Sequence, residues 1–220
     1  MERTVEAGAS MVPVVGGPVA VAFNTALGWS FTRRMDQWLD DLAEAVSELQ
    51  QRTEGLSFDD LARNDDFVDA VVSATRAAQA THAEEKLAAL RNGVLSTLGP
   101  NAPTADEQAR FFRLVEQFTP AHLRLLAFLD DPGAAFDAAG KPRPSLGVGG
   151  KWQLVEQGMP EFKDKREWYD LLDRDIAAAG LTKGNGQSIL HTNLSSDGLW
   201  NPGTNSLGRR FLAFISEPSH

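Results

Sequence analysis

The sequence predicts a mainly α-helical protein, with an N-terminal helical bundle followed by a small C-terminal α+β module. In the first 131 residues, apolar side chains recur at steps of three and four, which is the period of a helix with one buried face. Capping residues, glycines and prolines interrupt these runs at intervals that fit helix ends. Beyond residue 160 the pattern changes to one helix, a strand-like segment and a last short helix.

The composition is that of an ordinary globular protein. Of the 220 residues, 42% are hydrophobic and 23% are charged, which is enough apolar content to build a core. The absence of cysteine excludes disulfides, thiolate catalysis and zinc sites built on cysteine. The first six residues lack the basic region of a secretory signal, so we expect a cytoplasmic protein that could associate with a membrane through residues 7–32.

The negative charge is concentrated in the first half of the predicted bundle. The chain has a formal net charge of −9, and residues 36–69 alone hold eleven acids and two bases. Residues 132–220 balance ten acids with ten bases. Because an acidic surface repels phosphate, nucleic acid is not an expected partner of the bundle.

The first bundle helix is predicted over residues 25–52, with acids opposite one apolar stripe. The stripe comprises Met35, Trp38, Leu39, Leu42, Val46 and Leu49. After Gly55, which is expected to end this helix, Ser57 is placed to cap a short helical turn, with Asp60 three residues further on.

Three more helices complete the predicted bundle. One long helix is expected over 65–98, with an alanine-rich middle that lets a neighbouring helix come close. Thr104 and Glu107 form a capping-box pattern before a helix over 105–117. Thr119 followed by Pro120 then starts a helix over 121–129.

The C-terminal region is predicted to be a winged-helix-like module, residues 161–220, joined to the bundle (33–131) by a linker over 132–160. We expect a helix over 161–179 that ends at Gly180, then a hairpin over 181–200 with a strand at 188–192 and a turn at 196–198. Asn205 or Ser206 should cap a last helix over 207–215. The helix over 161–179 is rich in acids, and the Arg209–Arg210 pair alone makes no basic stripe, so protein contact is favoured over DNA binding.

The N-terminal arm, residues 1–32, has an uncharged stretch from Ala7 to Thr32. Prolines and glycines between Pro13 and Pro18 break its first half, which argues against a simple membrane span. Two interpretations stay open: an arm that opens the first helix and packs on the bundle, or a membrane-active segment. The residues predicted to contact a membrane or a partner are Val15, Val19, Phe23, Trp29 and Phe31.

No pattern of catalytic or metal-ligating residues stands out. Gly150–Lys151 lacks the preceding glycine and the following Ser or Thr of a phosphate-binding loop. His82 and Glu85 occur once and in the wrong order for a carboxylate-bridged metal site. Ser188, His191 and Asp197 can be written as a catalytic triad, although no glycine-framed elbow surrounds the serine. We therefore predict no enzyme, no cofactor and no metal.

Three segments resemble the Abi-alpha proteins linked to phage abortive infection. They are the glycine-broken apolar run Val14–Pro18, the segment Phe118–Leu126 with its Thr-Pro step, and the segment Ser206–Phe211. The resemblance spans most of the chain in order, and it departs from the family at the 132–160 linker. It implies a setting in phage defence and implies no catalytic residue.

Together these observations predict a non-enzymatic interaction protein of bacterial type, which binds a protein partner or associates with itself. One alternative is a membrane-active helical-bundle effector that uses residues 7–32. Another is a transcriptional regulator that uses the winged-helix-like module.

Overall fold

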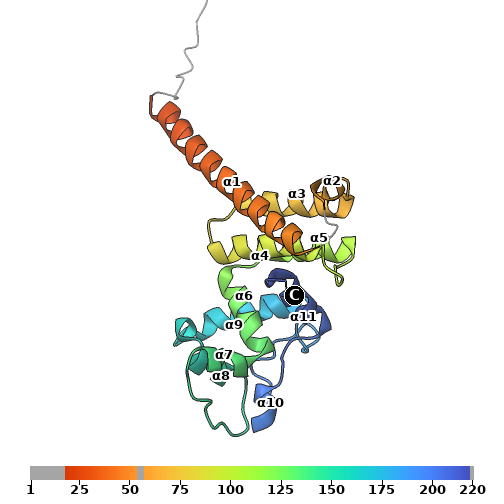
Figure 1. The fold of residues 1–220 in the computed structure, drawn as a ribbon. Helices are drawn as coiled ribbons and strands as arrows, with labels where there is room; N and C mark the ends of the chain where they lie inside the picture. The colour runs from red at the N-terminus through yellow and green to blue at the C-terminus, as the bar shows by residue number, and fades with distance from the viewer. Residues whose placement is uncertain (1–17, 54–56, 219–220) are drawn as a thin grey trace, which may run out of the picture.

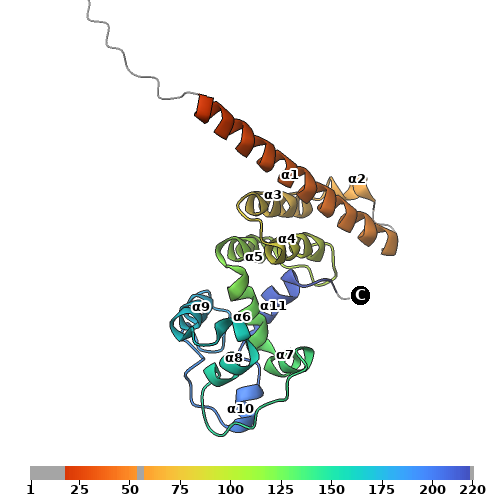
Figure 2. The same cartoon turned by 90° about the vertical axis from the view of Figure 1, so that its left-hand side faces the viewer.

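The computed structural model describes residues 18–53 and 57–218, and in these ranges it contains eleven α-helices and one 3-10 helix. The prediction of a mainly helical protein is confirmed (Figure 1). Helices α1 to α5 form one layer, α6 to α10 form a second, and α11 lies between them (Figures 1 and 2). The described residues contain no β-strand, only two isolated bridges.

Helix α1 (Pro18–Arg52) begins seven residues before its predicted start. Its C-terminal half packs on α3 (Asp65–Gln79) and α4 (Glu84–Ser96) and buries Trp38, Leu42 and Val46 of the predicted stripe. Its N-terminal half leaves the bundle and has no helix beside it in either view (Figures 1 and 2). Gly55, predicted to end this helix, lies outside the described residues.

Helix α2 (Phe58–Leu61) is the predicted short turn, and its cap is confirmed. The Ser57 hydroxyl accepts a hydrogen bond from the Asp60 amide at 3.1 Å. Leu61 is buried and anchors the turn to the bundle core.

The single long helix predicted over 65–98 is wrong, because the chain reverses between α3 and α4. The Thr81 hydroxyl accepts a hydrogen bond from the Ala83 amide at 3.1 Å, and the extended backbone of Ala83 begins α4. The reversal lets both halves bury their apolar faces on each other, which one straight helix cannot do. The buried residues of α3 include four alanines (Ala70, Ala74, Ala77 and Ala78), so the two helices pack closely, as the sequence indicated.

Helices α5 (Ala105–Gln117) and α6 (Pro120–Asp130) match the predicted third and fourth helices. The capping box of Thr104 and Glu107 is present. Thr119 caps α6 in a reciprocal arrangement with His122, which was not predicted. Helix α6 runs from the upper layer into the lower one and packs on α9 (Arg166–Ala178) (Figure 1).

The segment 132–160, predicted to be an irregular linker, contains ordered helices packed on the core. They are α7 (Pro132–Ala138) and α8 (Trp152–Gly158), followed by η1 (Pro160–Phe162). Phe136, Leu154 and Val155 are buried. Asp131, the last residue of the predicted bundle, is the N-cap of α7. Its carboxylate accepts a hydrogen bond from the Ala134 amide.

The hairpin predicted over 181–200 is wrong, and with it the winged-helix-like module. The Ser195 hydroxyl accepts a hydrogen bond from the Gly198 amide at 3.2 Å, so the predicted turn is the first turn of α10 (Ser196–Trp200). The segment predicted as a strand over 188–192 forms none. The two isolated bridges join Gly149 to Leu194 and Thr182 to Thr204, which ties loops together without building a sheet.

Helix α11 (Ser206–Ile215) closes the fold from below α4, and its predicted cap is confirmed at Asn205. The Phe214 ring lies 5.3 Å from the Phe111 ring and 5.0 Å from the Phe112 ring, between centroids. Gly93 of α4 leaves the space that the Phe214 ring occupies. This aromatic cluster joins the two layers into one core.

Candidate functional site

Four of the five predicted contact residues fall within the part of α1 that the bundle does not cover. Val15 lies outside the described residues, and Val19 and Phe23 fall in the first turns of α1, where only the backbone is described. Trp29 and Phe31 are 72% and 42% exposed. The two described members of the set are therefore open to a partner.

The covered and uncovered parts of α1 meet near Met35. Every described side chain from Gly28 to Arg34 is exposed, whereas Met35 is half-buried and Trp38 is buried. We call residues 18–34 the projecting half of α1 (Figures 1 and 2). Among the described residues, no helix has both the length and the apolar content needed to cross a bilayer.

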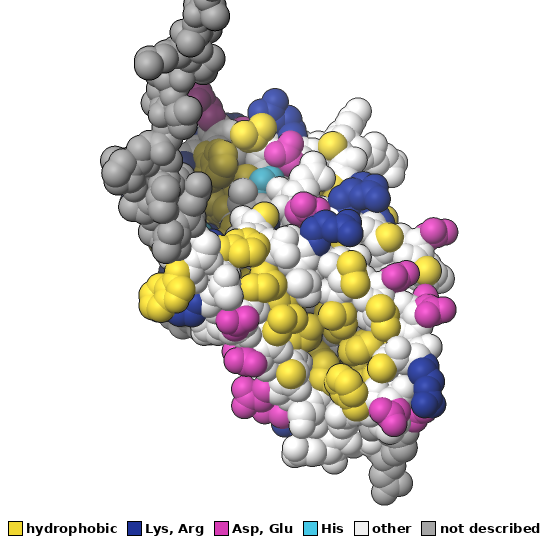
Figure 3. All heavy atoms as spheres, turned by 90° about the horizontal axis from the view of Figure 1, so that it is seen from above, with side chains coloured by type: hydrophobic (Ala, Val, Ile, Leu, Met, Phe, Trp, Pro, Cys, Tyr) yellow, Lys and Arg dark blue, Asp and Glu magenta, His cyan; other side chains and the backbone are white. Residues whose placement is uncertain are grey.

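A second exposed apolar surface continues from the projecting half across α1, α2 and α3. We call it the α1–α3 apolar face, and it consists of Leu39, Phe58, Val68 and Val72, which are 40–64% exposed. The Trp38 Nε1 donates a hydrogen bond to the Thr75 hydroxyl at 3.1 Å. This bond joins α1 to α3 next to the α1–α3 apolar face. Figure 3 shows hydrophobic side chains gathered on this face with acidic side chains at its margins.

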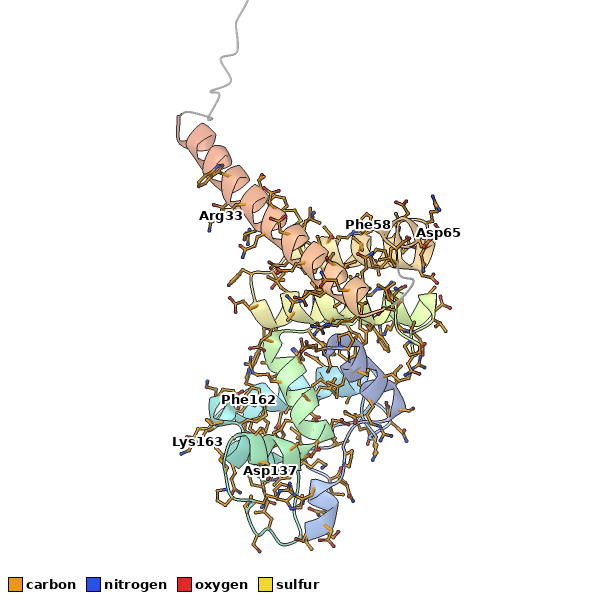
Figure 4. The ribbon with its side chains drawn as sticks, viewed as in Figure 1. Arg33, Phe58, Asp65, Asp137, Phe162 and Lys163 are labelled. Carbon is orange, nitrogen blue, oxygen red and sulfur yellow. The ribbon has the colours of Figure 1, made fainter. Side chains whose placement is uncertain are left out.

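The charges of the two surfaces are opposite. Residues 18–34 contain Arg33 and Arg34 and no acid, whereas residues 36–69 hold the excess of acids. Neither arginine forms an ion pair with another described residue in 18–53 or 57–218. Figure 4 shows Arg33 on the projecting half, and Phe58 and Asp65 at the far end of the α1–α3 apolar face.

A groove of about 490 Å³ follows the other side of α1, where the projecting half leaves α4. Its lining is mixed: Arg34, Asp41, His82 and Arg91 contribute charged or polar groups, and Trp38 contributes its ring. Leu87 and two alanines also line it, and the charged groups at the rim leave the groove open to water, unlike the enclosed apolar pockets that hold small molecules.

Ser188, His191 and Asp197, which can be written as a triad but were not predicted to act as one, are not joined as a triad in the structure. His191 Nε2 lies 2.8 Å from an Asp170 carboxylate oxygen, and its Nδ1 lies 3.3 Å from the Arg166 guanidinium. Because the guanidinium can only donate, Nδ1 accepts and Nε2 carries the proton that Asp170 receives. Neither ring nitrogen is left to activate Ser188, although both residues line the same open cavity of about 530 Å³.

Asp173 and Lys151 are buried charged groups that the sequence did not single out. Neither carboxylate oxygen of Asp173 has a hydrogen-bond partner in bonding geometry. Burial raises the pKa of Asp173, against the opposing attraction of the Ser188 hydroxyl and the amides of Ile189 and Leu190. The Asp173 carboxyl group is therefore fully buried beside the segment that carries Ser188.

The Lys151 ammonium joins two loops. Its Nζ donates to the carbonyl oxygens of Leu199 and Asn201, at 2.6 Å each, and the residue is 3% exposed. Burial, together with the smaller repulsion from the nearby Lys183, lowers the pKa of Lys151 to about 8. No sequence pattern marks this lysine, because its partners are backbone carbonyls some fifty residues away.

Glu85 of the His82–Glu85 pair takes part in an ion pair with Arg124. Glu85 binds the Arg124 guanidinium with both carboxylate oxygens, at 2.6 and 2.7 Å. Arg124 extends the network to Glu161 at 3.2 Å. Within 18–53 and 57–218, no three His, Asp or Glu side chains are grouped as metal ligands.

No protein-family model, curated protein or solved structure matches this chain. The class that the fold and the surfaces define is a helical protein with an exposed, apolar projecting helix.

Proposed function

We propose that this protein is a non-enzymatic interaction protein whose contact element is the projecting half of α1. The observation that carries the proposal is a helix that leaves the bundle with Trp29 and Phe31 exposed. The α1–α3 apolar face lies next to it and extends the surface available to a partner.

Intrinsic propensity does not account for a helix in this segment. Residues 18–34 contain valine, threonine, asparagine and glycine, which are weaker helix formers than alanine or leucine. Isolated helices shorter than ~12–15 residues are marginal in water even when they are rich in alanine, and the seventeen-residue projecting half is only slightly longer and has few alanines. A partner that covers the projecting half would supply the packing that stabilises it.

The exposed aromatic rings also favour a contact role. Burying a large apolar side chain contributes roughly 1.5–3 kcal/mol, and aromatic side chains dominate the binding energy of many interfaces. Leaving Trp29 and Phe31 in water forgoes that stabilisation in the free protein. Their burial against a partner would recover it.

A cavity that gathers His191, Ser188 and acidic residues supports a non-enzymatic role. In that cavity both nitrogens of His191 are engaged by Asp170 and Arg166. The arrangement is typical of a surface ion-pair network, because a general base needs a free nitrogen within reach of its substrate.

Site-specific photo-crosslinking tests the proposal directly. A photoreactive phenylalanine analogue would replace Trp29 or Phe31 in the full chain, in cells that express it. The matched control carries the analogue at Trp168, a tryptophan of α9 that is 44% exposed. We expect adducts of defined mass from positions 29 and 31 and none from position 168. Equal labelling at all three positions, or no adduct, would overturn the proposal.

A membrane-active effector is the second candidate, and one observation favours it. The uncharged run ends at an exposed tryptophan followed by Arg33 and Arg34, an order typical of segments that sit at a membrane surface. Dye release from vesicles, with the full chain and with Trp29→Glu, tests it. Release that the substitution abolishes would favour the effector; no release from either protein would remove it.

The phage-defence setting implied by the Abi-alpha resemblance is also a proposal. We expect that cells expressing the chain would restrict phage growth and that Phe31→Glu would weaken the restriction. Plaque counts measure both. Unchanged plaque counts with the wild-type chain would count against this setting without affecting the contact element.

A further inference from the structure

We propose that the partner of the projecting half is a second copy of this chain, which pairs its α1 antiparallel to the first about a two-fold axis at Met35. The inference rests on the proposed function, because it names the occupant of the same contact element. In this arrangement, each projecting half lies on the α1–α3 apolar face of the other copy.

The exposed stripe of α1 is symmetric about Met35. Phe31 lies four residues before Met35 and Leu39 four residues after it, so the three share one face of the helix. Phe31 and Leu39 are 42% and 45% exposed, and Met35 is half-buried between them. Antiparallel pairing about Met35 places Phe31 of one copy against Leu39 of the other, twice.

The charges along α1 favour the antiparallel arrangement. Arg33 and Arg34 precede Met35, whereas Asp36, Asp40 and Asp41 follow it, and all five are exposed. The two-fold axis at Met35 therefore lays the basic projecting half of each copy along the acidic part of the other copy's α1. A parallel pairing would instead lay the two acidic parts along each other.

Helix α3 widens the surface that receives the partner's projecting half. The Trp38–Thr75 hydrogen bond joins α1 to α3. The two helices pack on each other in the upper layer (Figure 1). Leu39 on α1 and Val68 and Val72 on α3 are all exposed members of the α1–α3 apolar face. A second helix laid beside α1 on this side would cover them.

The area that one helix can bury explains why the contact must be reciprocal. A projecting half of seventeen residues is ~25 Å long and ~10 Å wide, so one such contact buries about 500 Å² in total. A specific interface needs about 1,000 Å² or more. Two contacts related by a two-fold axis reach that area, whereas a single one does not.

Charge favours a second copy over an anionic membrane as the occupant. The surface beside the projecting half belongs to residues 36–69, which hold eleven acids and two bases. This surface would be repelled by anionic lipid, and it attracts the projecting half, which has two arginines and no acid.

Disulfide trapping in the full chain tests the register, because the wild-type sequence has no cysteine. The variants are Phe31→Cys and Leu39→Cys, with Trp168→Cys as a control of matched exposure. Under mild oxidation we expect the mixture of Phe31→Cys and Leu39→Cys to form a covalent dimer at least tenfold faster than Leu39→Cys mixed with Trp168→Cys. Phe31→Cys alone should dimerise slowly, because eight residues of helix separate the two thiols by ~12 Å, beyond the reach of a disulfide.

Two results would overturn the inference. One is a mixed dimer that forms no faster than the control; the other is faster trapping of Phe31→Cys alone, which would indicate parallel pairing. Sedimentation at several concentrations adds a charge test: Arg34→Glu removes positive charge from the projecting half and should weaken the dimer by about tenfold. If trapping fails while photo-crosslinking at position 31 yields an adduct of another mass, the contact element stands and only the second copy is excluded.

Discussion

A glycine-to-alanine substitution at two positions should have opposite effects on this fold. Gly28 lies in the projecting half of α1, and a Cβ atom added there has no heavy atom within 4 Å. Gly93 lies in α4, where an added Cβ would meet the Phe214 ring at 2.8 Å and the Phe112 ring at 3.0 Å. The same chemical change is therefore free of steric cost at one site and crowded at the other.

The magnitudes follow from helix propensity and packing. Alanine favours a helix over glycine by about 1 kcal/mol, so Gly28→Ala should stabilise the projecting half against local opening by about fivefold. At Gly93 the same gain is outweighed, because Phe214 is held between Phe111 and Phe112 and cannot move aside. Overpacking costs up to ~3 kcal/mol, which leaves a net loss of about 2 kcal/mol.

Two assays separate the outcomes. Amide hydrogen exchange at a protein concentration low enough to keep the chain monomeric should show slower exchange over 20–34 in Gly28→Ala, with an unchanged melting temperature. Gly93→Ala should lower the melting temperature by ~4–8 °C in thermal unfolding followed by circular dichroism. Equal melting temperatures for the two variants would refute the packing argument at Gly93. Unchanged exchange over 20–34 would refute the claim that propensity limits the projecting half.

Three further predictions concern the buried polar groups. Lys151→Met should lower the free energy of unfolding by about 3 kcal/mol in urea, because two carbonyls lose a charged donor, whereas Lys183→Met, at an exposed position, should change it little. The folded-state pKa of Lys151, about 8, lies below the ordinary 10.5, so the unfolded chain holds its proton to higher pH. The wild type should therefore gain about 2 kcal/mol over Lys151→Met between pH 7.5 and 9.5; a constant difference would contradict this. Burial also lowers the pKa of His122, whose Nδ1 accepts a hydrogen bond from the Thr119 amide. The unfolded chain therefore takes up this proton first, and the free energy of unfolding should fall as the pH drops below 6.5. In acid titrations of unfolding, His122→Asn should lose that dependence.

Local signals in the sequence predicted much of the bundle correctly. The helices over 105–117 and 120–130 and the caps at Ser57, Thr104 and Asn205 are where the residues indicated. Each depends on hydrogen bonds within one helical turn, so neighbouring residues carry the whole signal. Helix ends that lack such a signal were missed.

The errors occurred where distant contacts outweighed a local pattern. Nothing between Ala80 and Ala83 resembles a helix breaker, so the turn between α3 and α4 was not visible in the sequence. The Ser196–Gly198 segment suits both a hairpin turn and a helix start. The Ser195 hydroxyl caps this segment, which makes it the start of a helix. A hairpin did not form because residues 188–192 are not a strand.

The candidate contact surface was only half visible. An uncharged segment with Trp29 and Phe31 pointed to the projecting half of α1. The α1–α3 apolar face was not foreseen, because Val68 and Val72 read as part of a buried helical stripe. Val68 and Val72 are exposed because α3 buries Phe67 and its alanines in the core instead.

The sequence by itself determined the first helix of the bundle, the helices over 105–117 and 120–130, the caps, and the separation of an uncharged segment from an acidic one, since all of these depend on residues within a few turns of one another. Only the tertiary structure decided which apolar residues are covered. Trp38 and Phe31 lie on neighbouring parts of one amphipathic helix, and one is buried while the other is exposed. The difference arises because α3 and α4 extend beneath the first and stop short of the second, and burial depends on neighbours that the chain brings from far along the sequence.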